Sequence, residues 1–182
     1  MRTMRYLLSL IVLLPPAAAI AAAPVQDQAF FDGFDKPGTV DAAAPPELVT
    51  GSRIGMIVAA LEKGGFDVAV AKNGDGSPQI NSTDKDRPFA LEFYGCTSGF
   101  DCGYVQFVAG WDLPSGIDAG KIASWNSDHV WGAATRDTDN DPVLSLSVNL
   151  RGGVSQANFA DTVSLWSDTL DDFTSYIGWG KQ

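Results

Sequence analysis

Two cysteines, Cys96 and Cys102, are the residues of this chain whose type and spacing most directly suggest chemistry. Such a pair could form a disulfide, act as a redox couple or contribute to a metal site. Catalytic redox pairs are usually CxxC sequences beside the start of a helix, and metal sites need further ligands. Here five residues separate the two cysteines. We therefore expect a structural disulfide that closes a short loop, with the redox and metal functions as the alternatives.

Three alternating aspartates, Asp137, Asp139 and Asp141, form the second pattern that could do chemistry, because calcium loops contain carboxylates at this spacing. The calcium loop of a helix–loop–helix protein needs glycine at its sixth position and glutamate at its twelfth. Pro142 and Val148 occupy those positions here, and the run lies between two predicted strands. We expect a solvated hairpin turn instead of a metal site.

His129 is the single histidine of the chain, so the catalytic possibilities are few. A Ser–His–Asp triad would need a motif such as GxSxG to place the nucleophile, and the sequence lacks it. Zinc-dependent hydrolysis needs several His or Cys ligands. The Gly74–Gly76 turn is not followed by the lysine of a phosphate-binding loop. We expect His129 to cap or pack, and the sequence predicts no catalytic residues, no cofactor, no bound metal and no enzymatic activity.

The cysteine pair lies in an aromatic hairpin formed by residues 89–113. Side chains alternate across a strand, so one face of the first arm is apolar and the other carries Glu92 and Tyr94. The apolar positions of the two arms are Phe89, Leu91 and Phe93, followed by Val105, Phe107, Ala109 and Trp111. Closing the small loop at the turn would stabilise the fold by roughly 2–3 kcal/mol. We expect this hairpin to form the centre of the sheet.

Three helices are expected around the hairpin. The first follows Thr50 or Ser52 as its N-cap, and a short second helix follows Asp118. The last helix begins after Ser155 and ends at Gly178. Its apolar residues recur at spacings of three and four and form one stripe along about 33 Å of helix: Phe159, Val163, Trp166, Leu170, Phe173 and Ile177. A sheet or another helix must cover such a stripe.

Paired strands fill the intervals between the helices. The patterns predict strands over 66–72, 79–83, 130–136 and 143–150, in addition to the two arms of the hairpin. Strands connected by hairpin turns form antiparallel sheets. We therefore predict an α+β domain with an antiparallel sheet of about five to six strands. An N-terminal helix, a middle helix and a long C-terminal helix pack on this sheet.

The first residues of the chain have the layout of a secretory signal peptide. Arg2 and Arg5 precede a short apolar core, and small residues follow it. The apolar core is about half as long as the roughly 20 residues that a membrane-spanning helix needs. We predict a signal peptide at 1–21, a flexible Ala/Pro-rich linker at 22–50 and one domain at 51–182. The protein would then be periplasmic or secreted, without stable membrane insertion, and its cysteines would be paired.

The chain is strongly acidic, with 12 Lys and Arg against 22 Asp and Glu and a formal net charge of −10. Removal of the predicted signal peptide leaves 10 basic and 22 acidic residues, a formal charge of −12. Binding to nucleic acid or to anionic membranes depends on clustered Lys and Arg. The composition therefore argues against a nucleic-acid partner.

Three segments together resemble the YbjN family, a group of bacterial domains labelled as sensory transduction regulators. They are LEFYGCTSGFDCGYVQFVAGWDL, IASWNSDHVWGAATRDTDNDPVLSLSVNL and GGVSQANFADTVSLWSDTLDDFTSYIGW, and the resemblance covers residues about 52–179. Its more specific marks are Trp125–Asn126, Asp141–Pro142 and the terminal helix; the exported form with paired cysteines looks like a subset. The resemblance implies the fold of type III secretion chaperones, an antiparallel sheet with helices packed on it, often assembled as dimers. It also implies binding of protein segments through apolar surface patches.

These observations favour a non-enzymatic, exported domain that binds an unknown protein or peptide in a chaperone-like or regulatory role. Solvent-side aromatic residues are the expected contacts, namely Tyr94, Tyr104 and Trp131. The alternative is a small-ligand-binding protein or an enzyme with a pocket between the sheet and the last helix, near His129 or the Asp137 turn. A homodimer is a third possibility.

Overall fold

The computed structural model describes residues 47–180. The predicted signal peptide and most of the predicted linker therefore lie outside the described residues. The last linker residues are an exception, because Leu48–Val49 form strand β1 and pair antiparallel with strand β8 (Val154–Ser155). Val49 is only 1% exposed. The linker boundary at residue 50 was thus placed too late, since this apolar dipeptide already belongs to the domain.

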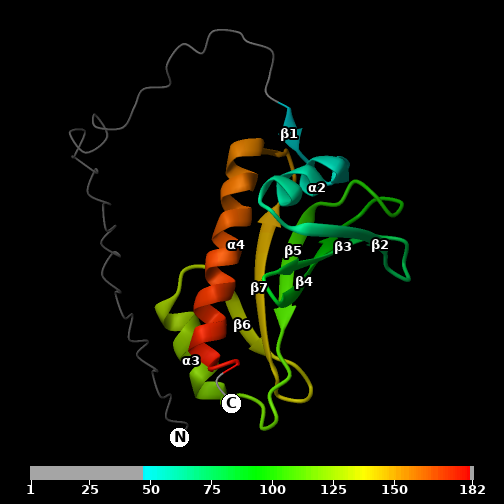
Figure 1. Ribbon diagram of the computed structural model, residues 1–182. Coiled ribbons are helices and arrows are strands. Elements are labelled where there is room, and N and C mark those ends of the chain that lie inside the picture. The colour runs from blue at the N-terminus through cyan, green and yellow to red at the C-terminus, as the bar shows by residue number, and fades with distance from the viewer. Residues whose placement is uncertain (1–46, 181–182) are drawn as a thin grey trace, which may run out of the picture. The chain divides into compact units, whose positions relative to one another are not determined.

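The main sheet has six antiparallel strands in the order β2-β3-β4-β5-β7-β6 (Figure 1). Their bounds are Asp67–Lys72 for β2, Pro78–Asp84 for β3, Arg87–Tyr94 for β4, Tyr104–Gly110 for β5, Ala133–Arg136 for β6 and Pro142–Asn149 for β7. The β4–β5 hairpin occupies the two central positions, as its two apolar arms predicted. With the helices described next, this sheet confirms the predicted α+β class.

The described residues contain three helices, α2 (Ile54–Lys63), α3 (Ala119–Asp128) and α4 (Gln156–Ile177). Asp118 caps α3 by accepting hydrogen bonds from backbone amides, and Ser155 caps α4 in the same way. The predicted cap of α2 was wrong. Arg53 holds that position without a side-chain hydrogen bond, and the hydroxyl groups of Thr50 and Ser52 bond to each other instead, 3.0 Å apart.

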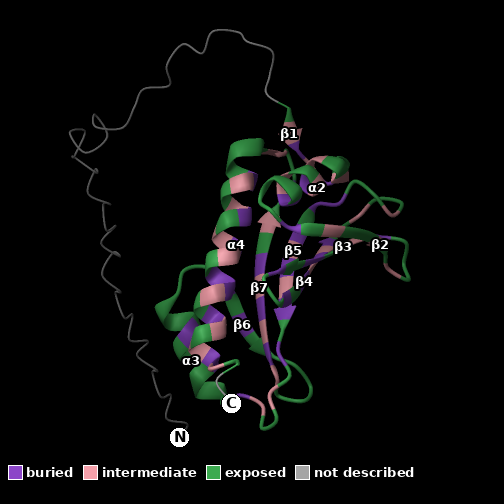
Figure 2. Ribbon diagram, in the orientation of Figure 1, coloured by how far each residue is buried: buried purple, intermediate pink, exposed green. Residues whose placement is uncertain are grey.

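The predicted apolar stripe of α4 is buried along its whole length (Figure 2), against the β4–β5 hairpin and, in part, against α2 and α3. The Trp166 ring lies 5.5 Å from that of Phe107 and 5.8 Å from that of Phe89, measured between centroids. Phe159 and Phe173 extend this aromatic layer in the two directions along the helix. Aromatic side chains of this size bury the largest apolar areas in a protein, so the layer accounts for much of the stability of the fold.

Candidate functional site

The second face of the six-stranded sheet carries none of the core side chains, because residues alternate between the two faces of a strand. We call it the open face. Its cross-strand rows are Ala69, Asn81, Ala90, Val108, Ser145 and Ala133; then Gln79, Glu92, Gln106 and Ser147; and then Tyr94, Tyr104 and Asn149. Every residue of these rows is half-buried or exposed. The small side chains of the first row border a trough of about 580 Å³ across β2 to β5.

Tyr94 and Tyr104 face each other directly across strands β4 and β5 at one end of the open face. Their exposed fractions are 47% and 42%. The Tyr94 hydroxyl donates a hydrogen bond to the Glu92 carboxylate, and the Arg151 guanidinium lies 5.3 Å from the Tyr104 ring centroid. This hydrogen bond, together with partial burial and the nearby negative charge, raises the pKa of Tyr94 to about 12. Both rings therefore have a charged neighbour: Glu92 beside Tyr94 and Arg151 beside Tyr104.

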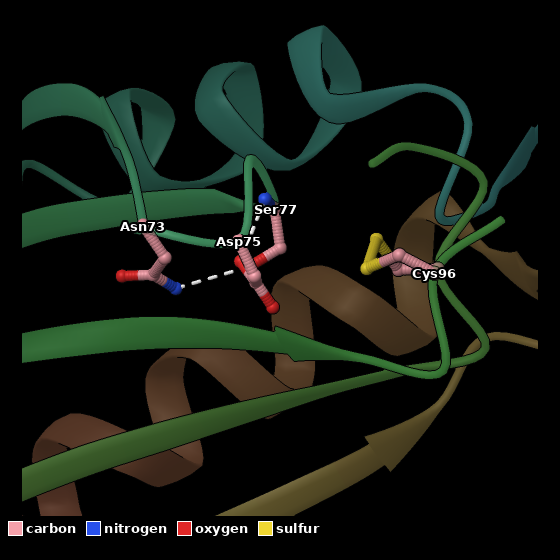
Figure 3. The surroundings of a disulfide bond; sticks show 5 residues. Asn73, Asp75, Ser77 and Cys96 are labelled. Carbon is pink, nitrogen blue, oxygen red and sulfur yellow. Dashed lines mark hydrogen bonds between the residues drawn. A yellow bond between two sulfur atoms is a disulfide. The ribbon is translucent and has the colours of Figure 1, made fainter. Parts of the chain in front are cut away.

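The disulfide loop lies at the same end of the sheet, because it connects β4 to β5. Cys96 and Cys102 are joined by a disulfide bond (Figure 3). Inside the loop, Thr97 and Phe100 exchange two backbone hydrogen bonds, and the Phe100 side chain is 63% exposed. Gly51 pairs with Cys102, where a side chain at position 51 would collide with the Cys102 backbone. The crosslinked loop therefore anchors the segment that leads into α2.

The Asn73–Ser77 turn between β2 and β3 lies beside this loop (Figure 3). Asp75 accepts hydrogen bonds from the amide and the hydroxyl group of Ser77, and these bonds lower the pKa of the Asp75 carboxyl. A side chain at Gly99 would come within 3.1 Å of the Gly76 carbonyl oxygen, so the two turns pack closely. Two hairpin ends thereby support the region around the tyrosine pair.

Trp131 lies apart from the two tyrosines. It is 56% exposed and borders a cleft on α4, on the helix-covered side of the sheet. The strand predicted over 130–136 begins only at Ala133, because Gly132 has a φ of 77° and interrupts the extended run. Of the three candidate contact residues, the structure therefore brings two together and separates the third.

The Asp137 turn uses its carboxylates to build the turn. Asp137 Oδ1 accepts hydrogen bonds from the amides of Asp139 and Asp141, at 2.9 Å each. Asp141 Oδ1 accepts a hydrogen bond from the Leu113 amide at 2.8 Å. The first and third aspartates therefore satisfy backbone donors, as in Asx turns. Within residues 47–180, no three His, Cys, Asp or Glu side chains lie where they could hold a metal ion together.

His129 packs on an aromatic neighbour. Its ring stacks on Trp125 with centroids 3.6 Å apart, and its Nδ1 lies 3.0 Å from the Trp125 carbonyl oxygen. The centre of the interface between the sheet and α4 is filled by the aromatic layer of the core. Two open clefts border α4 beside this filled centre: one includes Thr83, Ser164 and Ser167 in its lining, and the other includes His129. The small-ligand and enzyme alternatives therefore stay predictions.

An ionic cluster with a buried centre, Arg87 and Asp84, joins the β3–β4 connection to α4, and no sequence pattern predicted it. Arg87 binds Asp84 at 2.6 Å and Asp171 at 2.6 Å, and Lys85 binds Asp171 from the solvent side at 2.7 Å. The Ser167 hydroxyl donates to Asp84 at 2.9 Å. Hydrogen bonds from Lys85 and then Arg87 lower the pKa of the Asp171 carboxyl. Because each cation meets a carboxylate, this cluster is structural.

The geometry can be compared with known proteins. A family model named YbjN, described as "Putative bacterial sensory transduction regulator", matches residues 54–179. The chain belongs to the YbjN family. This family is described as a regulator, and its description names no enzymatic activity. A comparison with curated proteins gave no match.

The YbjN match includes α2, the whole six-stranded sheet and α4. Trp125–Asn126 and Asp141–Pro142, the marks that carried the resemblance, both have structural roles: the first fixes the loop before β6, and the second closes the turn before β7. No helix among residues 47–180 combines the length and the apolar run that a membrane crossing requires.

Proposed function

We propose that this YbjN protein is an exported, non-enzymatic regulatory domain that binds a protein or peptide partner through the Tyr94–Tyr104 end of the open face. The observation that carries the proposal is the cross-strand tyrosine pair, because each of the two tyrosines is more than 40% exposed. Tyrosine is enriched at the energetic centres of protein interfaces, since it combines a large apolar ring with a polar group.

The surroundings of the pair support an interface. Phe100 adds exposed aromatic surface at the same end of the sheet. Hydrogen-bonding groups lie in the cross-strand row next to the tyrosine pair, on Glu92, Gln106 and Ser147. An apolar centre with a polar rim is the usual anatomy of a protein interface. The disulfide and the paired strands hold these groups in place, which lowers the entropy that binding costs.

Export is supported by the layout of residues 1–21 and by the disulfide, because disulfides persist mainly in oxidising compartments. Membership of a regulator family supports a signalling role in the cell envelope. A homodimer formed through the same tyrosine surface is the alternative occupant. Light scattering on the mature protein distinguishes it, since a dimer has twice the monomer mass.

The test is affinity capture from periplasmic extract with immobilised mature protein, compared with the double variant Tyr94→Ala/Tyr104→Ala. We expect the wild type to enrich a discrete partner and the double variant to lose it. Trp179→Ala is the matched control, because it removes another exposed aromatic side chain, which follows the end of α4 and lies outside the tyrosine surface. Circular dichroism verifies that both variants fold. A partner retained by the tyrosine variant, or no enriched protein at any salt concentration, would overturn the proposal.

A further inference from the structure

The loop between α3 and β6 is exposed, and hydrogen bonds from α3 side chains anchor its C-terminal end. The Trp125 indole donates a hydrogen bond to the Gly132 carbonyl at 2.6 Å. The Asn126 side chain bonds both backbone groups of Ala134, at 2.8 and 2.9 Å. A side chain at position 132 would collide with the Thr169 methyl group, so the loop backbone lies directly on α4.

The loop presents two large apolar side chains to solvent, and we call Val130 and Trp131 the apolar ledge. Val130 is 89% exposed, the highest value among the large hydrophobic residues of the described chain. The hydrogen bonds at Gly132 and Ala134 anchor the chain directly after these two residues. An exposed apolar pair on an anchored segment loses less entropy when a partner covers it than one on a free loop would, which favours binding.

A cleft of about 330 Å³ separates the ledge from α4. Its floor is apolar, formed by the stacked rings of Trp125 and His129 and by Leu165. Three carboxylates from both walls line it, those of Asp128, Asp168 and Asp172. None of the three takes part in an ion pair or a side-chain hydrogen bond within residues 47–180. This differs from the Asp84–Arg87–Asp171 cluster on the same helix, in which charges are compensated.

We propose that this cleft is a second binding surface, for a polypeptide segment in which a Lys or Arg lies beside an apolar side chain. The apolar residue would cover the ledge, and the cation would lie against Trp131 and the three carboxylates. Cations bind favourably over tryptophan rings, and an uncompensated acidic wall attracts them. The acidic net charge, −10 for the full chain and −12 without the predicted signal peptide, attracts basic segments over a longer range. This surface extends the protein-binding function to a partner of defined chemistry and does not involve the tyrosine pair.

The test uses a fluorescein-labelled 12-residue peptide of alternating Arg and Leu, with anisotropy as the readout for the full mature protein. An Arg/Ser peptide and a Glu/Leu peptide separate the charged and apolar contributions. We expect micromolar binding of the Arg/Leu peptide and weaker binding of the other two.

Two variants locate the binding. Trp131→Ser and Asp168→Asn/Asp172→Asn should each weaken the Arg/Leu peptide by about tenfold, the loss expected for a cation–π contact or an uncovered charge pair. The charge-matched control Glu62→Gln/Asp161→Asn removes two exposed carboxylates elsewhere and should change affinity less than twofold. Equal weakening by both charge pairs, or no binding at millimolar peptide, would overturn the proposal. Retention of binding in Tyr94→Ala/Tyr104→Ala distinguishes this result from failure of the tyrosine surface.

Discussion

Arg87 is the residue whose charge the fold depends on most directly. Its guanidinium is buried and bridges Asp84 in the β3–β4 turn to Asp171 in α4. Replacing Arg87 with Met keeps much of the side-chain volume but leaves the buried Asp84 carboxylate without its cation. Removing one partner of a buried pair costs about 3–5 kcal/mol, so we expect a loss of unfolding free energy of about this size. Urea denaturation followed by tryptophan fluorescence measures it.

The control is Lys85→Met, which removes the exposed cation that binds the same Asp171. Exposed ion pairs contribute about 0–1 kcal/mol, so this variant should lie within that range. The double variant Arg87→Met/Asp84→Asn should be less destabilised than the sum of the single changes, because the two residues interact. Equal effects of Arg87→Met and Lys85→Met would show that the cluster is not buried as described.

The hydrogen bond from Tyr94 to Glu92 gives the open face a measurable pH signature. It raises the pKa of Tyr94 from 10.0 to about 12. A folded-state pKa above the unfolded value means that the contribution to stability is fully present below about pH 10 and is lost as the pH rises towards 12. In Glu92→Gln the tyrosine should ionise closer to pH 10. Ultraviolet difference titration at the tyrosinate band tests this, and identical curves for both proteins would contradict it.

At the scale of elements, regular patterns were predictable and single contacts were not. The stripe of α4 and the alternation of β4 and β5 follow from helix and strand periodicity, and both are confirmed. Strand β1 has only Leu48–Val49, which is too short to show a period. The Asp84–Arg87–Asp171 cluster joins positions far apart in sequence, so only the packing of α4 on the sheet creates it. Trp131 was assigned to a strand because the effect of Gly132 on the backbone is not visible in an apolar pattern.

The disulfide loop is an element whose stability can be tested alone. Cys96→Ser/Cys102→Ser removes a crosslink that closes a very short loop, and the chain-entropy model then predicts a loss of roughly 2–3 kcal/mol. Because the loop packs on the β2–β3 turn and on Gly51, we expect local loosening there, which hydrogen exchange would show. Reduction of the wild type should produce the same loss and leave the double variant unchanged. A reductant effect on the double variant would contradict this account.

For the whole molecule, the layered fold separates the two surfaces that we propose for partners. The three helices cover one face of the sheet, and the tyrosine pair lies on the other. The apolar ledge lies on the helix-covered side. A regulator of the YbjN family built this way could contact two partners, or two segments of one partner, without structural rearrangement. The acidic charge of the chain disfavours a polyanion as the occupant of either proposed surface.

We propose that the tyrosine end of the open face contacts another protein in the cell. Photo-crosslinking tests it most directly, with benzoylphenylalanine placed at Tyr104 and, as a control, at Ser164, an exposed position on α4. We expect a discrete crosslinked band at position 104 that disappears with Tyr94→Ala, and no such band at position 164. The absence of a band at Tyr104, or the same band at both positions, would contradict it.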